Sequence, residues 1–211
     1  MRLKSETLSL CYLATGNTHK VEEFKRLARE LNIPLDFRSA DEIGGMPKVE
    51  ETGTTFSENA NLKAEGLAAT VAGKPGAFIL ADDSGLAVDA LDGRPGIYSA
   101  RYAGPEAGDG ENVAKLLQEM KSIPEGKRSG RFICALTLLA SGGKSISVAG
   151  SCEGKIAAEP QGEAGFGYDP VFIPEGYEQS LAALGPEVKD QLSHRRKALE
   201  LLKNKIGATS L

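Results

Sequence analysis

Residues 77–85 of the chain read Ala77-Phe78-Ile79-Leu80-Ala81-Asp82-Asp83-Ser84-Gly85. The first five are apolar and uncharged, which is typical of a buried strand. We predict that Asp82 and Asp83 lie at the carboxyl end of this strand, where open α/β sheets place ligands, and that Ser84-Gly85 begins a turn. Two adjacent ionised carboxylates repel each other, so a site that keeps both supplies a cation or raises a pKa. A solvated turn is the alternative interpretation.

Strand and helix patterns alternate on both sides of this stretch. Apolar runs predict strands at 8–14, 35–39, 86–91, 131–140 and 145–150, with 155–157 extending the last sheet. Helical spacing predicts helices at 21–31, about 55–69 and 112–120, and a last helix after Ser193. Gly142-Gly143 predicts a hairpin turn. Early alternation followed by a late hairpin favours a mixed α/β sheet.

Composition narrows the class of protein. The 211 residues suffice for one large domain or two small lobes, and a net charge of −4 argues against binding to a nucleic acid polymer. Three widely spaced cysteines suggest no disulfide framework, and two histidines make a zinc site a poor fit. No apolar stretch approaches a membrane span, and residues 1–7 carry no signal-peptide core, so we expect a cytoplasmic protein without a membrane partner.

Two lysines fall near predicted helix starts. Lys20 ends the loop that joins the first strand to its helix, and such a loop directs backbone N–H groups at whatever lies above the sheet. Lys63 follows Asn59 by four residues on the helix that Thr55 and Glu58 open as a capping box. The face shared by Asn59 and Lys63 either is solvated or lines a cleft. For Lys20, an ordinary turn with a surface lysine is the alternative.

Two later segments combine aromatic, acidic and basic residues. Glycines at 162, 165 and 167 flank Phe166, Tyr168 and Asp169, and such a loop can bring its backbone close to a ligand while an aromatic ring stacks on a base. Ser193 is predicted to cap the last helix, which places His194 and Arg195 in its first turn, where the helix dipole disfavours cations. A residue that breaks a local rule is a candidate for function, and a solvated basic patch is the alternative.

The chemistry of these groups points to a metal and phosphate. A second acidic pair, Glu50-Glu51, joins Asp82-Asp83 in a chain with few histidines, and carboxylates without histidine suit a hard cation. Lysines and helix N-termini complement phosphate oxygens, and an extra carboxylate can deprotonate an attacking water. The residues therefore predict magnesium-dependent chemistry on a phosphorylated small molecule.

Taken together, the motifs resemble the inosine triphosphate pyrophosphatase family. The matching segments follow the family's order along nearly the whole chain: 14–20, 50–53, 59–64, 81–86, 95–104, 165–170 and 193–195. The resemblance implies hydrolysis of inosine, deoxyinosine and xanthosine triphosphates (ITP, dITP and XTP) to the monophosphate and pyrophosphate. It also implies magnesium as cofactor, a homodimer, and one elongated two-lobed α/β domain over residues 1–211 with the active site in the cleft between the lobes.

The resemblance also implies roles for individual residues. Asp83 matches the general base, with Asp82 and Lys63 beside it in the catalytic set, and Glu51, Asp83 and Glu50 are the expected metal ligands. Contacts to the triphosphate are implied for the first loop, with no separate role for its histidine: Thr15, Gly16, Asn17, Thr18, His19 and Lys20. Ser84 should touch the nucleotide, and the base pocket is implied for Phe166, Gly167, Tyr168, Asp169, Lys189, His194 and Arg195.

Two other functions are consistent with parts of the pattern. An aspartyl phosphatase would explain acids after a strand, but it needs Asp-x-Asp at the end of the first strand, where this chain has Ala14-Thr15-Gly16. A non-catalytic nucleotide-binding module is the second. Release of pyrophosphate, of orthophosphate, or of neither distinguishes the three.

Overall fold

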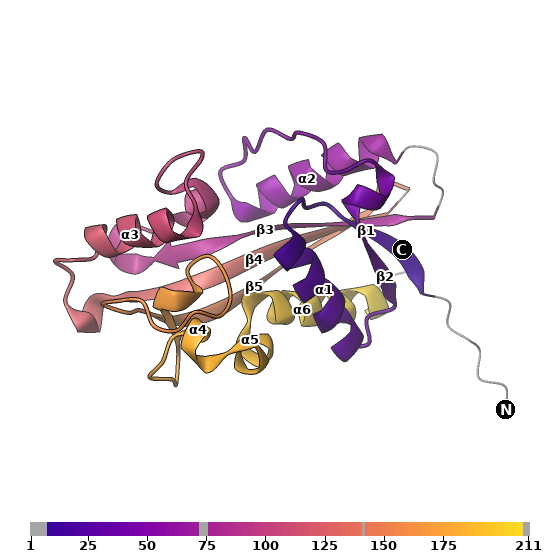
Figure 1. The fold of residues 1–211 in the computed structure, drawn as a ribbon. Helices are drawn as coiled ribbons and strands as arrows, with labels where there is room; N and C mark the ends of the chain where they lie inside the picture. The colour runs from indigo at the N-terminus through magenta and orange to yellow at the C-terminus, as the bar shows by residue number, and fades with distance from the viewer. Residues whose placement is uncertain (1–7, 72–75, 141, 209–211) are drawn as a thin grey trace, which may run out of the picture. The chain divides into compact units, whose positions relative to one another are not determined.

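The computed structural model describes residues 8–71, 76–140 and 142–208 (Figure 1). The prediction for residues 1–7 lies outside these ranges. Six strands form one sheet in the order β2-β1-β3-β4-β5-β6. They span Ser9–Leu13 (β1), Leu35–Ser39 (β2), Phe78–Val88 (β3), Ser129–Leu139 (β4), Ser145–Ile156 (β5) and Phe172–Pro174 (β6).

Helices lie at the four predicted places, and the described residues also contain two short helices before the last one that were not predicted. They span Thr18–Glu30 (α1), Phe56–Thr70 (α2), Asp109–Glu119 (α3), Leu181–Leu184 (α4), Pro186–Leu192 (α5) and His194–Ala208 (α6). Strand β1 runs parallel to β2 and β3, whereas β5 and β6 are antiparallel. The predicted mixed α/β fold with a sheet flanked by helices is therefore confirmed. The location of the active site in a cleft between lobes stays a prediction.

The prediction around the central acids needs a correction. Asp82 and Asp83 do not end a strand, and Ser84-Gly85 is not a turn, because β3 runs without a break from Phe78 to Val88. The separate strand predicted at 86–91 is thus part of β3 only as far as Val88, and Asp89–Leu91 forms a 3-10 helix instead. Its parallel partner β1 ends at Leu13, opposite Leu80, so the acids lie beyond the carboxyl end of the neighbouring strand. The edge at which parallel strands place ligands is therefore that of β1.

Gly85 is part of this strand for a steric reason. A Cβ atom at Gly85 would lie 2.6 Å from the carbonyl oxygen of Gly96, closer than side chains tolerate. Glycine therefore serves here for close approach of another backbone segment and not for a turn. In the same way, the separate segments predicted at 145–150 and 155–157 form the single strand β5.

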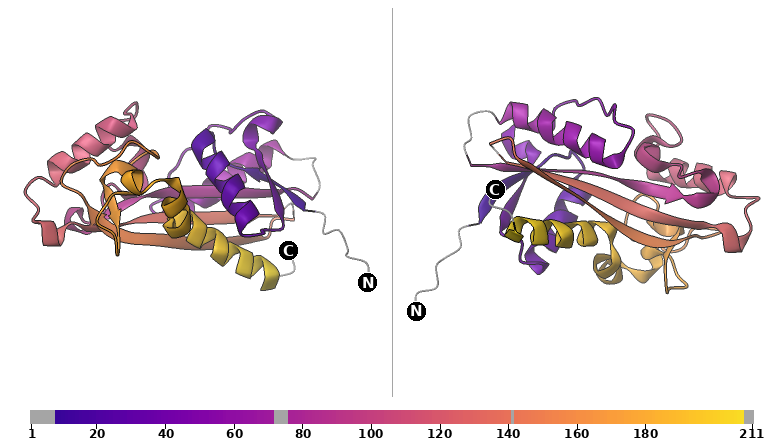
Figure 2. Two further views of the ribbon diagram at one scale, coloured as in Figure 1. Left: turned by 60° about the horizontal axis from the view of Figure 1, so that its bottom comes forward. Right: turned by 180° about the vertical axis from the view of Figure 1, so that it is seen from behind.

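The chain divides into two compact units. Of the described residues, unit 1 comprises 8–71, 76–83, 135–140, 142–149 and 198–208, and unit 2 comprises 84–134 and 150–197. In unit 1, α2 covers one face of the sheet and α1 and the later part of α6 lie on the other (Figures 1 and 2). Leu67 of α2 packs against Ile79 and Ala81, whose side chains share one face of β3 because strand residues alternate.

Unit 2 has a core of its own. Leu116 of α3 and Met120, the C-cap residue of that helix, are fully buried with Leu86 of β3, and the rings of Phe132 and Phe172 lie 4.7 Å apart. Cys11, Cys134 and Cys152 are all buried and form no disulfide, as predicted. Among the described residues, none of the helices has the length and apolarity that crossing a membrane requires.

Candidate active site

Each acid of the central pair has its own lysine. The Lys20 ammonium lies 2.6 Å from Asp82 Oδ1, and the Lys63 ammonium lies 2.6 Å from Asp83 Oδ1. Both carboxylates are buried, since the Asp82 and Asp83 side chains are only 2% and 8% exposed. Lys63 also donates to the backbone oxygen of Asp82 at 3.2 Å and lies 3.5 Å from Glu51 Oε2. Unit 1 thus gathers three carboxylates around two cations.

The start of α1 places Lys20. Asn17 is the N-cap, and its side-chain oxygen accepts a hydrogen bond from the Lys20 backbone N–H at 3.2 Å. Thr15 Oγ1 in turn accepts from the Asn17 N–H at 3.1 Å. The helix begins at Thr18, three residues before the predicted start, so Lys20 occupies its first turn. The prediction that Lys63 is also near a helix start is wrong, because it lies in the middle of α2.

Asn59 joins the two acidic segments. It is fully buried; its side-chain oxygen accepts from the Gly53 N–H at 2.9 Å, and its amide donates to Asp83 Oδ2 at 3.4 Å. Asn59 has no role among the predicted site residues, although its spacing of four residues from Lys63 predicts a shared face. That face is buried against β3 and not solvated. Asn59 therefore holds both the loop of Glu51 and the Asp83 carboxylate.

Burial and charge act in opposite directions on the Asp83–Lys63 pair. Burial raises the pKa of Asp83, the Lys63 ammonium lowers it, and Glu51 and Asp82 raise it again, so that the pKa lies above its usual value. For Lys63, burial lowers the pKa, but the attraction of Asp83, Asp82 and Glu51 outweighs burial and the pKa is raised. The pair thus joins a firmly protonated lysine to a carboxylate of increased basicity.

The carboxylates of this cluster suit a hard cation whose coordination shell is completed by a bound ligand. Glu51 and Asp83 approach the same positive charge, the Lys63 ammonium, from two elements, whereas Glu50 is exposed. Within the described residues, no group of three or more His, Cys, Asp or Glu side chains is arranged to hold a metal. Magnesium commonly takes one or two carboxylates and fills its shell with water and phosphate oxygens. Glu51 and Asp83 have the right chemistry for that arrangement.

A second cluster forms in unit 2 around Phe166. Asp169 Oδ2 accepts from the Lys189 ammonium at 2.7 Å and from the Phe166 N–H at 2.9 Å. The Lys189 ammonium lies 4.3 Å and the Arg195 guanidinium 5.3 Å from the centre of the Phe166 ring. Burial raises the pKa of Asp169 above its usual value, although Lys189 opposes this effect. Four of the predicted base-pocket residues are thus brought together.

The start of α6 orients the basic residues of this cluster. Ser193 Oγ accepts from the Arg196 N–H at 3.1 Å, as predicted for an N-cap. Arg195 Nη2 donates to Ser84 Oγ at 2.9 Å, so a residue of β3 holds the guanidinium in place. The His194 ring stacks on Phe132 at a centroid distance of 4.9 Å.

The other predicted residues lie apart from these side-chain contacts. Tyr168 is 4% exposed and donates its hydroxyl hydrogen to the Ser99 carbonyl at 2.8 Å, so its ring belongs to the core of unit 2. Gly167 donates its backbone N–H to Asp109 at 2.6 Å. Exposed positions in the first loop and the first turn of α1 are Gly16, Asn17, Thr18 and His19.

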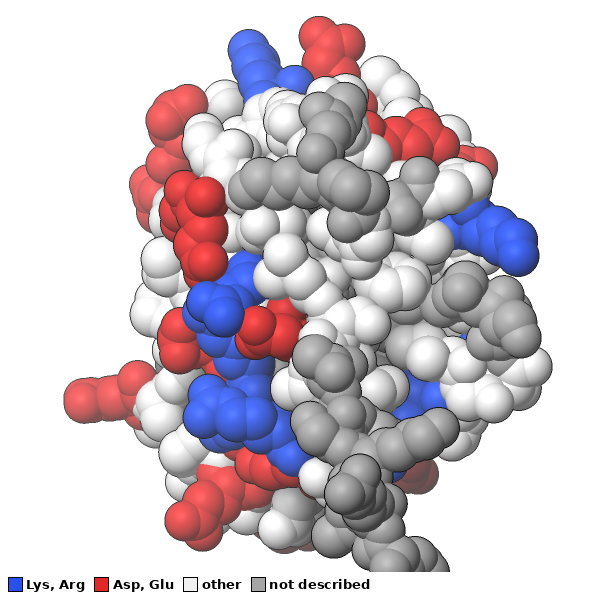
Figure 3. Space-filling model, turned by 90° about the vertical axis from the view of Figure 1, so that its right-hand side faces the viewer, with Lys and Arg blue, Asp and Glu red and all other residues white. Residues whose placement is uncertain are grey.

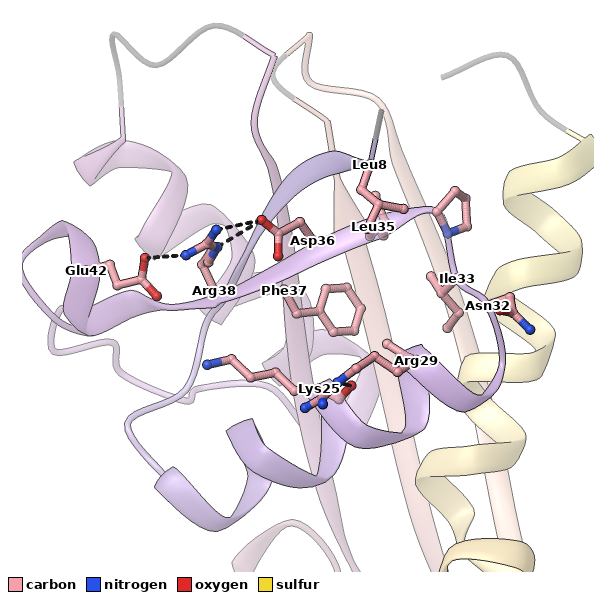
Figure 4. A pocket seen from close by; sticks show the side chains of 12 residues that line it. Leu8, Lys25, Arg29, Asn32, Ile33, Leu35, Asp36, Phe37, Arg38 and Glu42 are labelled. Atoms are coloured by element: carbon pink, nitrogen blue, oxygen red, sulfur yellow. Dashed lines mark hydrogen bonds and ion pairs between the residues drawn. The ribbon is translucent and has the colours of Figure 1, made fainter. Parts of the chain in front are cut away.

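A hollow of about 690 Å³ lies elsewhere in unit 1, between α1 and β2 (Figure 4). On that side of the molecule, basic side chains gather next to acidic ones (Figure 3). In the hollow, Arg38 pairs with Asp36 at 2.9 Å and with Glu42 at 3.6 Å, and Arg29 donates to the Lys25 carbonyl. Exposed ion pairs of this kind are ordinary surface chemistry, so size alone does not make this hollow the active site.

The fold and the two clusters define a mixed α/β protein with a buried carboxylate–lysine site and an aromatic site lined by cations. The chain belongs to the Ham1 family, whose model matches residues 11–205. A dITP/XTP pyrophosphatase of Oceanobacillus iheyensis is 45% identical over 190 residues, covering 90% of this chain and 94% of that protein. A dITP/XTP pyrophosphatase of Bacillus subtilis is 45% identical over 196 residues, covering 93% and 96%.

Solved structures agree with this assignment. A HAM1 protein from Coxiella burnetii matches with a TM-score of 0.82 and 37% identity, covering 95% of this chain and all of that chain. The Ham1 protein of Staphylococcus aureus gives a TM-score of 0.81 at 37% identity, covering 94% and 98%. The family expected from the ordered sequence motifs is therefore confirmed.

Replacing Asn59 should destabilise the protein. Asn59→Ala leaves the Gly53 N–H without its acceptor and removes a donor from Asp83, so we expect a loss of about 1–3 kcal/mol in the free energy of unfolding. Urea denaturation measures it. The control is Asn61→Ala in the same helix, where the exposed side chain accepts a single bond from Thr137 and the loss should be smaller. Equal losses would contradict the linking role of Asn59.

Proposed function

We propose that this protein hydrolyses deaminated purine nucleoside triphosphates, namely dITP, ITP and XTP, to the nucleoside monophosphate and pyrophosphate. The observation that carries the proposal is the pair of buried carboxylates in β3, each held by a lysine from a different helix. A site of this kind offers cations for phosphate oxygens and a carboxylate for an attacking water. Relatives that share 45% of their residues with this chain are named dITP/XTP pyrophosphatases.

The first cluster is assigned to the triphosphate. Lys20 and Lys63 supply positive charge, and the start of α1 supplies backbone N–H groups, which together suit phosphate oxygens. The two ammonium groups already lie 2.6 Å from Asp82 and Asp83, so their positions are set before a ligand arrives. Positioning of charge in advance lowers the reorganisation needed in the transition state.

Asp83 is assigned as the general base. Its raised pKa makes the carboxylate a better proton acceptor, and the hydrogen bond from Asn59 orients it. Water attacks the α-phosphorus and gives its proton to Asp83 as the new P–O bond forms. The bond between the α-phosphorus and the pyrophosphate oxygen then breaks, and the protonated lysines stabilise the negative charge on the departing pyrophosphate.

Magnesium is the proposed cofactor. Glu51 and Asp83 would hold it, with Glu50 nearby in sequence, and the triphosphate would complete its shell. When bound, magnesium neutralises charge on the phosphate oxygens. The cation also balances a cluster in which three carboxylates, Glu51, Asp82 and Asp83, already face two lysines.

The second cluster is assigned to the purine. The Phe166 ring offers a stacking surface, and Lys189 and Arg195 lie beside it as donors. Arginine has donors only, so it pairs with the 6-keto oxygen of hypoxanthine and xanthine and faces an unpaired donor at the 6-amino group of adenine. Ser84 holds the Arg195 guanidinium in place for this purpose.

The products test the reaction. Incubation with dITP or XTP in oxygen-18 water should release pyrophosphate and place the label in the monophosphate, because water attacks the α-phosphorus. Excess chelator should abolish release. Release of orthophosphate would support the aspartyl phosphatase instead, and no release would support a binding module. Label in the pyrophosphate, or full turnover with chelator, would contradict the mechanism or the metal assignment respectively.

Substitution of Arg195 tests the base assignment. Arg195→Ala should lower kcat/KM for ITP by an amount equivalent to about 1–3 kcal/mol and narrow its advantage over ATP, because a charged donor to the keto oxygen is lost. The control is Arg196→Ala, which removes the same charge from the next position of α6. An unchanged ratio of kcat/KM for the two nucleotides would mean that Arg195 does not read the base.

We further propose that the enzyme is a homodimer that works in the cytoplasm, as the family resemblance implies. Sedimentation should then report a particle of two 22.2 kDa chains. A monomer at micromolar concentration would contradict this part of the proposal.

A further inference from the structure

The segment that carries Phe166 has little secondary structure to support it. Gly162, Gly165 and Gly167 all adopt positive φ, at 74°, 84° and 63°. Residues 162–165 are exposed, and the first regular turn begins only at Asp169. A glycine-rich loop has many accessible conformations, so an aromatic ring on it keeps one position only if other contacts fix the backbone.

Packing does not supply that support on the side facing α3. A hollow of about 420 Å³ separates the loop from the helix, and its walls are mainly apolar. Val113, Ala114 and Leu117 line it from α3, and Gly165, Phe166 and Pro170 line it from the loop. Side chains across an open space gain little dispersion energy, so the distance between loop and helix depends on polar contacts.

Two consecutive amides of the loop each donate to a buried or helix-borne carboxylate. The Phe166 N–H donates to Asp169, which is three residues away and also accepts from Lys189 of α5. The Gly167 N–H donates to Asp109 Oδ2 at 2.6 Å, and Asp109 comes from the first turn of α3, 58 residues earlier in the chain. The second of these two bonds ties the loop directly to α3.

Helix α3, which carries Asp109, is held firmly in unit 2. Leu116 and Met120 anchor it in the core of unit 2. The Asn112 side chain accepts from the Ala103 N–H at 2.8 Å and donates to the Ala100 carbonyl at 3.2 Å. Asp109 thus extends from a helix that is fixed on its buried face.

We propose that Asp109 is a positioning residue for purine binding, which acts by holding the Gly167 amide and thereby the Phe166 ring. This inference rests on the proposed function for its effect on catalysis, but the contact itself is independent of it. Asp109 itself is assigned no contact with the substrate. Its loss should therefore weaken nucleotide binding and leave the chemical step nearly unchanged.

The test combines amide exchange with kinetics. In Asp109→Ala, the Gly167 amide should exchange with deuterium about tenfold faster or more, because one hydrogen bond that closes it is lost. The KM for dITP should rise about 3- to 10-fold, while kcat changes less than about twofold. Asp109→Asn keeps an acceptor oxygen and should restore most of both properties.

The matched control is Glu111→Ala. Glu111 lies in the same turn of α3 and accepts from the Gly108 N–H at 2.8 Å, so its loss removes an equal charge and a capping bond without touching the loop. A role limited to helix stability would make the two alanine variants alike in thermal stability, KM and Gly167 exchange, and that result would overturn the proposal. If Asp109→Ala does not fold, unchanged exchange and KM in Asp109→Lys would overturn it equally.

The two hypotheses fail in different ways. If the wild-type protein releases no pyrophosphate from dITP, the proposed function fails, and the exchange of the Gly167 amide still reports whether Asp109 holds the loop. If the wild type is active but Asp109→Ala matches Glu111→Ala, only the positioning role fails.

Discussion

Neighbouring residues of a strand point to opposite faces of its sheet, and this constraint shapes the site. Asp82 and Asp83 are adjacent in β3 and both are buried, so one cation cannot serve both side chains equally. The structure meets this demand from two sides: α1 brings Lys20 to Asp82 on one face, and α2 brings Lys63 to Asp83 on the other. Removing either lysine would deprive a buried carboxylate of its nearest cation, which is far more costly than losing a surface ion pair.

The same need to satisfy buried charge organises the second cluster. Asp169 is buried and is stabilised by the Lys189 ammonium and the Phe166 N–H. These bonds bring a cation over the Phe166 ring, and the Arg195 guanidinium lies near the same ring. One buried carboxylate therefore fixes an aromatic surface together with its donors. The glycines on either side let the backbone turn tightly enough for this arrangement.

Sequence reasoning failed where it relied on local turn chemistry. Ser84-Gly85 has the composition of a turn, yet it lies inside β3, because Gly85 is needed for close approach of the Gly96 carbonyl. The hydroxyl of Tyr168 likewise bonds to the carbonyl of Ser99, which is 69 residues earlier in the chain. Neither the partner of a glycine nor that of a hydroxyl is visible in local sequence.

Local patterns did not predict β6, α4 or α5, but they did locate strands β1 to β5, helices α1, α2, α3 and α6, the caps at Thr55 and Ser193, and the residue types able to bind metal and phosphate. These features depend on periodicity and on bonds within one turn, such as those of Thr55 with Glu58 and of Ser193 with Arg196. Only the tertiary structure decided that Asn59 links Gly53 to Asp83 and that Lys63 serves Asp83 from the middle of a helix. Such contacts join residues far apart in the chain, and their geometry depends on how helices pack across a sheet, which no short stretch of sequence encodes.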